Sequence, residues 1–387
     1  MLTVLCIIGT RPEAIKMAPV IKALLRERDR VRALVCATGQ HRAMLDQVLE
    51  VFRIVPDFDL DLMRSDASLS ELTAALLRGL DGVVGRCRPD WVLAQGDTTT
   101  VLAAALTASY HRVRFGHVEA GLRTGDRRRP FPEEINRSLA DRLADLLFAP
   151  TERVRQTLRG EGVPEDRIVV TGNTVVDALR EVAELPYDWS AGPLASLPPG
   201  RRFVLITAHR RESFGGPFRE ICAAIRDLAQ TFREEPFQFV YPIHLNPNVR
   251  RPAFELLSGL PNLSLVEPLD YLSLVNLMKR SALILTDSGG IQEEAPGLQV
   301  PVLVLRDTTE RPEGIALGAA RLVGTRRARI VAEASRCLRD PSALAPLARG
   351  TNPYGDGHAA ERIVAALLER RRFTMPGSVI SDSPTFR

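Results

Sequence analysis

The chain opens with Leu2-Thr-Val-Leu-Cys-Ile-Ile8, an uninterrupted apolar run, and continues directly into Gly9-Thr-Arg-Pro-Glu-Ala-Ile-Lys16. The run is apolar throughout rather than at every second residue, which is typical of a strand covered on both faces of a parallel sheet. A glycine permits a tight turn, and a proline suits the first turn of a helix. This stretch therefore predicts a strand, a turn and a helix N-terminus that offers free N–H groups to an anion.

The same alternation of short apolar runs and longer helical patterns continues along most of the chain. We expect strands at 2–8, 31–37, 91–95, 115–118, 203–207, 238–242, 263–266, 283–286 and 302–305. We expect helices at 13–28, 42–52, 69–86, 98–110, 217–232, 248–257 and 272–280, and a further helix from 291. Such alternation predicts an α/β fold with parallel sheets that carry helices on both faces.

The pattern is interrupted once, between Leu185 and Gly200, where Pro, Gly, Ser and Ala accumulate. We therefore expect two doubly wound, Rossmann-like domains at 1–184 and 201–357, joined by a linker at 185–200. Ligands of such sheets bind at the carboxyl ends of the strands, which places the active site in the interdomain cleft. The tail at 374–387 is polar and rich in Ser and Pro, so we predict that it is disordered.

The composition argues against several classes of protein. The 387 residues are 45% hydrophobic and 25% charged, as in a soluble globular protein. There is no apolar run of about 18 residues and no signal-peptide pattern, so we expect a cytoplasmic protein without membrane contact. The five cysteines form no Cys-x-x-Cys pair, which argues against disulfides and structural zinc. We interpret the arginine triplets at 127–129 and 370–372 as surface rather than as a nucleic-acid site.

Two basic residues follow the first expected strand. Arg11 and Lys16 could make charge-assisted hydrogen bonds to a diphosphate. The alternative is an ordinary basic helix start on the surface. Neither a G-x-G-x-x-G fingerprint at this turn nor a G-x-x-x-x-G-K-[ST] loop elsewhere accompanies them.

Three carboxylates lie near consecutive strand ends of the first half. Asp97 follows the strand at 91–95, Glu119 follows the strand at 115–118, and Glu133 opens the next helix. Because these strand ends share one edge of the sheet, we expect the three groups to cluster. Clustered carboxylates raise one another's pKa values, as proton transfer near neutral pH requires. Asp97 could instead serve as a helix N-cap.

The strand ends of the second half carry a histidine, a glycine pair and further charges. His209 follows the strand at 203–207, and Ser288–Gly290 follow the strand at 283–286. Two glycines let phosphate oxygens approach the backbone, and Glu294, one turn further, could reach ribose hydroxyls. Arg311 supplies another cation near a strand end. No H-E-x-x-H metal pattern and no G-x-S-x-G nucleophile elbow are present.

Taken together, these motifs resemble the bacterial, non-hydrolysing UDP-N-acetylglucosamine 2-epimerase family. The matching strings are collinear over about residues 1–372, and eleven of them in order form a highly specific pattern. They are GTRPEAIKMAP (9–19), GQH (39–41), QGDTTT (95–100), HVEAGLRTGD (117–126), PEEINR (132–137), TGNTVVDA (171–178), HRRESFG (209–215), HLNPNVR (244–250), DSGGIQEE (287–294), RDTTERPE (306–313) and NPYGDG (352–357).

The resemblance implies a glycosyltransferase-B-like fold, with a terminal helix at about 358–372 that packs back on the first domain. It also implies a homodimer that works without NAD or a catalytic metal. The reaction would be reversible epimerisation of UDP-N-acetylglucosamine to UDP-N-acetylmannosamine, which supplies N-acetylmannosamine units for surface polysaccharide. A base would take the proton at carbon 2, UDP would leave by anti elimination, and UDP would add back to the bound 2-acetamidoglucal.

The resemblance also assigns roles to individual residues. The catalytic positions are Asp97, Glu119, Glu133 and His209. The positions that bind UDP or the sugar are Arg11, Lys16, Asp97, Glu119, His209, Leu269, Leu274, Ser288, Gly289, Gly290, Glu294 and Arg311. The chain departs from the family at the uracil pocket, where it has Leu274 in place of a common phenylalanine and Leu269 in place of a glutamine. Some members have a second, activating nucleotide-sugar site, whose lining corresponds to Gln40, His41, Glu134, Arg210 and His244.

Three other functions stay open at this point. A hydrolysing relative would release UDP and free N-acetylmannosamine from the same fold. A glycosyltransferase of the same architecture would pass the sugar to an acceptor, although no insertion that could bind an acceptor is visible. A nucleotide-sugar sensor without activity would have no use for an intact set of carboxylates.

Overall fold

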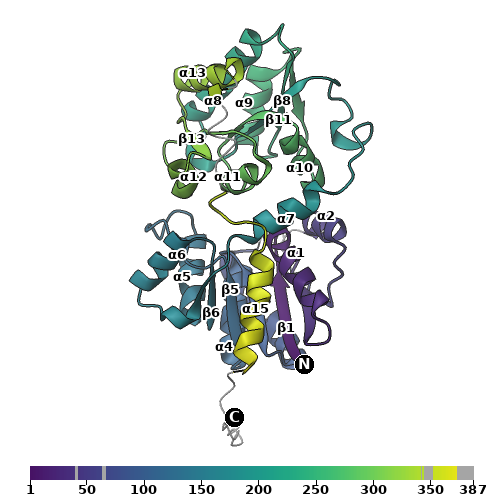
Figure 1. The fold of residues 1–387 in the computed structure, drawn as a ribbon, viewed down its shortest axis with the longest axis vertical. Helices are drawn as coiled ribbons and strands as arrows, with labels where there is room; N and C mark the ends of the chain where they lie inside the picture. Colours follow the sequence, from purple (N-terminus) through teal and green to yellow (C-terminus); the bar gives the residue numbers. More distant parts are fainter. Residues whose placement is uncertain (40–41, 63–66, 341, 344–351, 373–387) are drawn as a thin grey trace, which may run out of the picture.

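In the computed structural model, the described residues are 1–39, 42–62, 67–340, 342–343 and 352–372. The predictions for Gln40, for His41 and for the tail at 374–387 lie outside these ranges. The described chain forms two α/β domains that lie one above the other along the long axis (Figure 1). This confirms the fold class predicted from the alternation of strands and helices.

The first domain contains a seven-stranded parallel sheet in the order β3-β2-β1-β4-β5-β6-β7. The strands are β1 (Leu2–Ile8), β2 (Val31–Ala37), β3 (Phe58–Asp59), β4 (Trp91–Gln95), β5 (Arg114–Val118), β6 (Leu146–Ala149) and β7 (Ile168–Val170). The helices are α1 (Arg11–Arg26), α2 (Arg42–Phe52), α3 (Leu69–Cys87), α4 (Thr99–Tyr110), α5 (Glu133–Leu143), α6 (Glu152–Gly160) and α7 (Thr174–Ala183), with a 3₁₀ turn at Glu165–Arg167.

The second domain contains a six-stranded parallel sheet in the order β10-β9-β8-β11-β12-β13. The strands are β8 (Arg202–Thr207), β9 (Phe237–Pro242), β10 (Leu263–Val266), β11 (Ser281–Thr286), β12 (Val302–Val304) and β13 (Ala320–Leu322). The helices are α8 (Gly216–Thr231), α9 (Pro247–Leu257), α10 (Tyr271–Lys279), α11 (Gly289–Glu294), α12 (Pro312–Ala316) and α13 (Arg327–Arg339), with 3₁₀ turns at Gly192–Leu194, Arg211–Ser213 and Ala295–Leu298.

Each sheet reverses its strand order once, and the functional predictions fall at these two places. The reversal lies between β1 and β4 in the first sheet and between β8 and β11 in the second. In open α/β sheets, ligands bind beyond the carboxyl ends of the strands at this switch point. The turn after β1 packs closely against its neighbours, since a Cβ on Gly9 would lie only 2.7 Å from Oγ1 of Thr38.

The core strands agree with the sequence pattern, whereas some boundaries differ. The helix expected from Ile291 begins at Gly289 and ends at Glu294, after six residues. Pro296 follows closely, and the residue before a proline disfavours the α conformation, so the chain continues as a 3₁₀ turn. The pattern did not predict the short strands β3, β6, β7 and β13.

The terminal helix α15 (Ala359–Arg372) returns to the first domain, where it contacts α1 and α7 (yellow in Figure 1). Its buried residues Ile363 and Leu367 belong to an apolar cluster that also includes α1 and continues into the second domain. Helix α7 contacts α10 and α11 of that domain. The two sheets are therefore joined by a packed apolar layer, while the exact domain boundaries at 184 and 200 stay a prediction.

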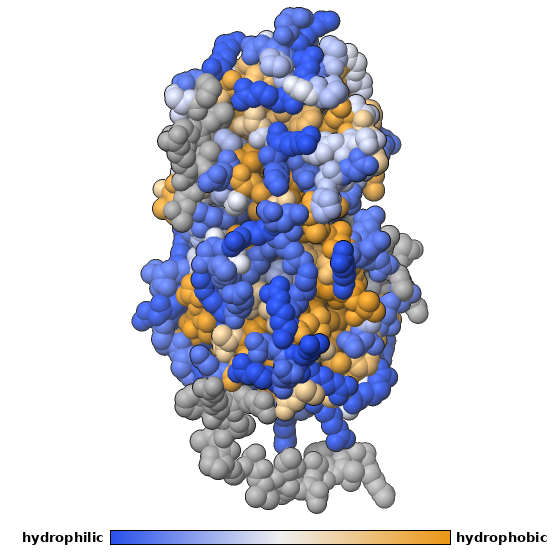
Figure 2. All heavy atoms as spheres, turned by 45° about the vertical axis from the view of Figure 1, so that its right-hand side comes forward, coloured by the Kyte–Doolittle hydropathy of each residue, from blue (hydrophilic) through white to orange (hydrophobic). Residues whose placement is uncertain are grey.

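The outer surface is mixed. On the face shown in Figure 2, hydrophobic residues appear in scattered groups between hydrophilic side chains over both domains. Among the described helices, none combines the length and the apolar character that crossing a membrane requires.

Candidate active site between the two sheets

Glu119 is the best-connected of the predicted carboxylates. It follows β5 and accepts hydrogen bonds from Nζ of Lys16 at 2.7 and 2.8 Å. The side-chain amides of Gln95 and Asn173 also donate to it. Burial alone would raise the pKa of Glu119, but the charges of Lys16 and Arg311 outweigh burial and lower the pKa. The prediction that neighbouring carboxylates would raise its pKa is therefore wrong, because cations rather than carboxylates surround it.

Four buried charges connect the two domains at this point. Nζ of Lys16 lies 3.5 Å from Oε2 of Glu293 on α11, and Nη2 of Arg311 lies 3.8 Å from Oε1 of Glu119. Nε of Arg311 donates to Glu293. Burial would lower the pKa values of Lys16 and Arg311, but the two carboxylates outweigh burial and raise both. We call Lys16, Glu119, Glu293 and Arg311 the interdomain ion-pair network.

Asp97 lies at the end of β4 and is held by helix α5. Nη2 of Arg137 donates to its carboxylate at 2.6 Å, and the side-chain amide of Asn136 donates to its backbone carbonyl at 3.0 Å. The N-cap of α4 is Thr98. The alternative role of Asp97 as a helix N-cap is therefore wrong, because its side chain points to Arg137 instead of to the N–H groups of α4.

Glu133 is the first residue of α5. Its Oε2 atom is buried and has no hydrogen-bond partner among the described residues. Buried acceptors without a hydrogen-bond partner are uncommon in folded proteins, and a bound ligand or a catalytic role is one reason for them. Glu134, the next residue, accepts hydrogen bonds from the backbone N–H groups of Thr124 and Gly125 and so holds the loop that precedes α5.

Glu13 is a buried carboxylate that the sequence analysis did not select. Its Oε2 accepts from the backbone N–H groups of Gly9 and Thr10 at 2.6 and 2.8 Å, and its Oε1 accepts from the hydroxyl of Thr98. Glu13 thereby ties the turn that carries Arg11 to the turn that carries Asp97. Burial raises the pKa of Glu13 to about 7. The capping-box spacing T-x-x-E at 10–13 is the sequence signal that could have identified it.

The residues of the second domain that were predicted to bind the nucleotide lie on and around α11. A Cβ on Gly290 would meet only ordinary contacts, at 3.8 Å from Oγ of Ser288, whereas a Cβ on Gly289 would lie 2.9 Å from Oε1 of Glu310. Glu294 accepts from the hydroxyl of Tyr271 at 2.9 Å, and burial raises its pKa to about 7. Burial lowers the pKa of Arg11, and the charges of Asp270 and Glu294, both in the second domain, oppose that shift.

The remaining predicted ligand positions lie around this region. Ser288 is the N-cap of α11, and its backbone N–H donates to Oγ1 of Thr286 at 2.9 Å. Leu269 is buried and Leu274 is partly buried, and both pack in the apolar layer between the domains. Their proposed contact with uracil stays a prediction.

His209 stacks on His244, with 5.2 Å between the ring centroids. The backbone N–H groups of His209 and Arg210 donate to Oδ2 of Asp287 at 2.7 and 2.8 Å. Burial lowers the pKa of His209, and the charge of Asp287 opposes it only in part. The structure thus places two of the residues assigned to a second site, Arg210 and His244, beside His209, whereas Glu134 lies on α5 of the first domain.

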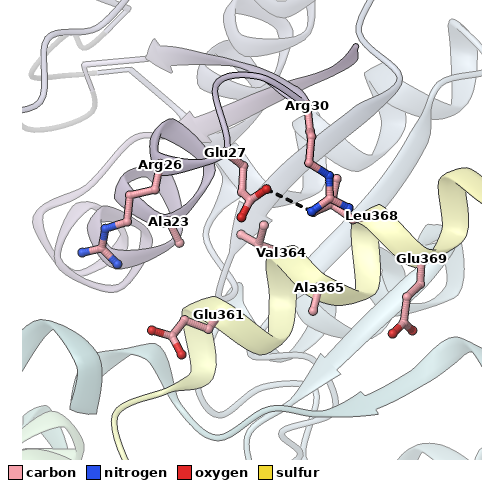
Figure 3. A pocket seen from close by; sticks show the side chains of 9 residues that line it. All are labelled: Ala23, Arg26, Glu27, Arg30, Glu361, Val364, Ala365, Leu368 and Glu369. Carbon is pink, nitrogen blue, oxygen red and sulfur yellow. Dashed lines mark hydrogen bonds and ion pairs between the residues drawn. The ribbon is translucent and has the colours of Figure 1, made fainter.

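A cavity of about 450 Å³ lies elsewhere, between α1 and α15 (Figure 3). Its lining includes Val364 and Leu368 of α15, and an ion pair between Glu27 and Arg30 stands at its edge. The cavity begins at Ala23, about 10 Å along α1 from Lys16. It holds none of the predicted site residues. Within the described part of the chain, no three His, Cys, Asp or Glu side chains gather in a way that could hold a metal ion.

The two doubly wound sheets, the returning terminal helix and the charged residues between the sheets define a glycosyltransferase-B-like architecture. A family model described as UDP-N-acetylglucosamine 2-epimerase matches residues 23–368. The chain therefore belongs to the UDP-N-acetylglucosamine 2-epimerase family, as the motifs predicted.

Individual relatives agree with this assignment. The UDP-N-acetylglucosamine 2-epimerase of Escherichia coli strain K12 is 51% identical over 374 residues, which cover 95% of this chain and 99% of that protein. A crystal structure of the Neisseria meningitidis UDP-GlcNAc 2-epimerase bound to UDP-GlcNAc matches with a TM-score of 0.87 and 45% identity, over 95% of this chain and all of that one. The Methanocaldococcus jannaschii enzyme in complex with UDP-GlcNAc and UDP matches with a TM-score of 0.80 and 35% identity, over 95% and 100% of the two chains.

Proposed function

We propose that this protein is a non-hydrolysing UDP-N-acetylglucosamine 2-epimerase, which interconverts UDP-N-acetylglucosamine and UDP-N-acetylmannosamine. The observation that carries the proposal is the interdomain ion-pair network, in which the buried cations Lys16 and Arg311 lie beside the buried carboxylates Glu119 and Glu293. The relatives named UDP-N-acetylglucosamine 2-epimerase are about half identical to the chain over nearly its whole length.

The cations fit the leaving group of the proposed reaction. A proton at a carbon beside an acetamido group is not acidic, so departure of UDP must drive the elimination. Lys16 and Arg311 would stabilise the negative charge that develops on the diphosphate, aided by Arg11. Because both cations are bound to Glu119 and Glu293 in the present structure, a diphosphate would have to replace these carboxylates.

That exchange would also prepare a base. Lys16 and Arg311 hold the pKa of Glu119 down against the effect of burial. When a diphosphate draws the two cations away, burial would dominate and the pKa of Glu119 would rise toward the range useful for proton transfer. Substrate binding would thereby convert Glu119 from the partner of an ion pair into a carboxylate that can accept a proton.

The elimination and its reversal need groups on both faces of the sugar. One carboxylate takes the proton from carbon 2, the electron pair of that bond forms the double bond between carbons 1 and 2, and UDP leaves. Another group returns a proton to the opposite face of carbon 2 while UDP adds back to carbon 1. Asp97, Glu119 and Glu133 are the proposed proton carriers, and His209 is the proposed partner on the phosphate side.

The finer assignments rest on the resemblance. The homodimer, the cytoplasmic location, the supply of N-acetylmannosamine for surface polysaccharide and the activating role of His244, Arg210 and their neighbours stay predictions. A hydrolysing epimerase would share the same fold, so the reaction products must separate the two.

A nuclear magnetic resonance time course with UDP-N-acetylglucosamine in deuterated water tests the proposal. We expect UDP-N-acetylmannosamine to appear, with one deuteron at carbon 2 of both UDP-sugars at equilibrium. Free UDP and free N-acetylmannosamine in equal amounts, without UDP-N-acetylmannosamine, would instead identify a hydrolase. Transfer of the sugar to an added acceptor, without epimerisation, would identify a glycosyltransferase.

A further inference from the structure

His117 is a fully buried histidine two residues before Glu119, near the carboxyl end of β5. None of the proposed catalytic steps uses it. Its ring stacks on that of Phe115, with 6.0 Å between the centroids. A buried, titratable ring this close to the proposed site requires a reason beyond packing.

Both ring nitrogens of His117 face atoms that accept hydrogen bonds. Nδ1 lies 2.5 Å from Oδ1 of Asp141, and Nε2 lies 2.7 Å from the backbone carbonyl oxygen of Gly96. A carbonyl oxygen can only accept, so Nε2 carries a hydrogen. Nδ1 must donate as well if Asp141 is ionised, and the ring is then an imidazolium.

The surroundings of Asp141 keep it ionised. Its second oxygen, Oδ2, accepts from the backbone N–H of Gly121 at 3.1 Å and lies 2.7 Å from Nη2 of Arg123. Burial would raise the pKa of Asp141, but His117 and Arg123 outweigh burial and lower it. Burial would lower the pKa of His117, but Asp141 outweighs burial, and the pKa of His117 is raised despite the opposing charge of Arg123.

This hydrogen-bonded chain joins the three segments that carry the proposed catalytic carboxylates. Gly96 directly precedes Asp97, His117 lies two residues before Glu119, and Asp141 lies on α5, the helix that Glu133 opens. We call the chain of Asp141, His117 and the Gly96 carbonyl the His117 clamp. It fixes the carboxyl end of β4 to that of β5, and both of them to α5.

The backbone at the clamp is held in an unfavourable conformation. Glu119 has φ = +65°, in the left-handed region that residues with a Cβ rarely occupy. Such a conformation persists only where the surrounding structure enforces it, and it is common at active sites. The backbone N–H of Gly121 donates to Asp141 on α5 and so ties the turn that contains Glu119 to that helix. The clamp therefore supports this backbone conformation.

We propose that His117 and Asp141 are positioning residues, which hold the side chains of Asp97 and Glu119 at the separation that the epimerisation requires. In this arrangement the imidazolium is a permanent buried cation, and it exchanges no proton with the substrate. This inference rests on the proposed function, because it concerns the carboxylates that function uses.

The first test measures the protonation of the ring without any activity assay. The full-length protein with ¹⁵N-labelled histidine contains six histidines, and comparison with His117→Gln assigns the resonances of His117. We expect both ring nitrogens to carry a proton in the pH range above 6.5, where an ordinary histidine is mostly neutral. A neutral ring with one protonated nitrogen in this range would overturn the proposal.

The second test uses His117→Gln, Asp141→Asn and the double variant, which removes one buried positive and one buried negative charge together. We expect kcat to fall by on the order of 10²-fold, as for a small misplacement of catalytic groups. The KM for UDP-N-acetylglucosamine and the affinity for UDP should stay close to those of the wild type, because Lys16 and Arg311 are unchanged.

The chain offers a matched control in the same domain. His111 and Asp81 form a histidine–aspartate pair at 2.7 Å on the surface, so His111→Gln and Asp81→Asn should leave kcat unchanged. Each single clamp variant leaves one buried charge without its partner and could fail to fold for that reason. If either single variant does not fold, the double variant, which removes both charges, is the one that tests the proposal. A double variant with wild-type kcat would overturn the proposal, and so would a double variant that does not fold, because the pair would then only support the fold. An inactive wild type would overturn the proposed function instead.

Discussion

The ammonium nitrogen of Lys16 lies 3.5 Å from Oε2 of Glu293, an ion pair that joins α1 of the first domain to α11 of the second. Lys16 is at the same time bound to Glu119, and Glu293 to Arg311. The two domains are therefore bridged by buried ion pairs in this structure. Under the proposed function, UDP binding is an exchange of partners, in which a diphosphate takes cations that carboxylates now hold.

Replacing Lys16 should weaken both the bridge and the binding of UDP. In Lys16→Met we expect the affinity for UDP to fall by roughly 1–3 kcal/mol, through the loss of a charge-assisted hydrogen bond. Without ligand, small-angle scattering should show a larger radius of gyration than in the wild type, and saturating UDP should make the wild type more compact. Lys22→Met is the control, because Lys22 pairs with Glu181 inside the first domain. Unchanged scattering and UDP affinity in Lys16→Met would contradict this prediction.

The three proposed proton carriers should affect turnover much more than binding. Asp97→Asn, Glu119→Gln and Glu133→Gln each keep the shape of the side chain and remove its proton-transfer capacity. We expect each to lower kcat by on the order of 10²-fold or more, with a much smaller change in UDP affinity. Steady-state kinetics and calorimetry measure the two effects.

Thermal melting must accompany these kinetics, because two of the carboxylates hold buried cations. Asp97 pairs with Arg137, and Glu119 pairs with Lys16. Breaking a buried ion pair can cost about 3–5 kcal/mol of stability. A well-folded Asp97→Asn protein with near-normal kcat would remove Asp97 from the catalytic set.

Arg311→Ala should act first on nucleotide binding. We expect it to weaken the binding of UDP by roughly 1–3 kcal/mol. It should also lower kcat, because the same contact would stabilise the departing diphosphate. Arg306→Ala is the matched control: Arg306 is a partly buried arginine of the same segment, but it pairs with Glu310 and Glu212. Equal losses of UDP affinity in the two variants would argue that only the general positive charge of this segment matters.

Glu13 gives the stability of the protein a defined pH dependence. Its pKa is raised from 4.5 to about 7, so the folded protein binds this proton more tightly than the unfolded chain does. The resulting stabilisation is complete below about pH 4.5 and is lost as the pH rises through about 7. The change should be on the order of 3 kcal/mol, at 1.36 kcal/mol per pH unit across this window.

The variant Glu13→Gln removes this titration because an amide does not ionise. The glutamine can keep the contacts of Glu13, since its oxygen can accept from the N–H groups of Gly9 and Thr10 and its NH₂ group can donate to the hydroxyl of Thr98. We expect urea unfolding between about pH 5 and pH 8 to show the wild type losing stability relative to Glu13→Gln. Glu71→Gln is the control, since Glu71 holds the equivalent capping-box position at the exposed start of α3. Parallel pH profiles for the wild type and Glu13→Gln would show that the pKa of Glu13 is not raised.

The sequence predicted the fold because the central strands are apolar on both faces. β1, β2 and β4 were placed at their observed bounds, and β8 and β11 were placed within two residues of theirs. Only a strand between two layers of helices requires apolar residues at every position. The edge strands β3 and β13 were missed because two or three residues carry too little periodicity.

The sequence also placed most candidate site residues at the strand ends where the structure has them, since the chain order and the parallel connections determine which ends share an edge. It could not determine their charge partners. The partners Lys16 and Glu119 are 103 residues apart, and Arg137 and Asp97 are 40 residues apart. For this reason the expected mutual rise of the carboxylate pKa values was wrong for Glu119, and the roles of Glu293, Glu13 and His117 were not foreseen.

Residue types and their periodicity therefore determined the two parallel sheets, the switch points and the chemistry available beside them. Only the tertiary structure decided which carboxylates are paired with cations, which are buried without such a pair, and which hold the backbone in place. The physical reason is that apolar periodicity acts between near neighbours in the chain. The energy of a buried charge depends instead on the few groups within about 4 Å of it, and the folded topology brings those groups from distant parts of the sequence.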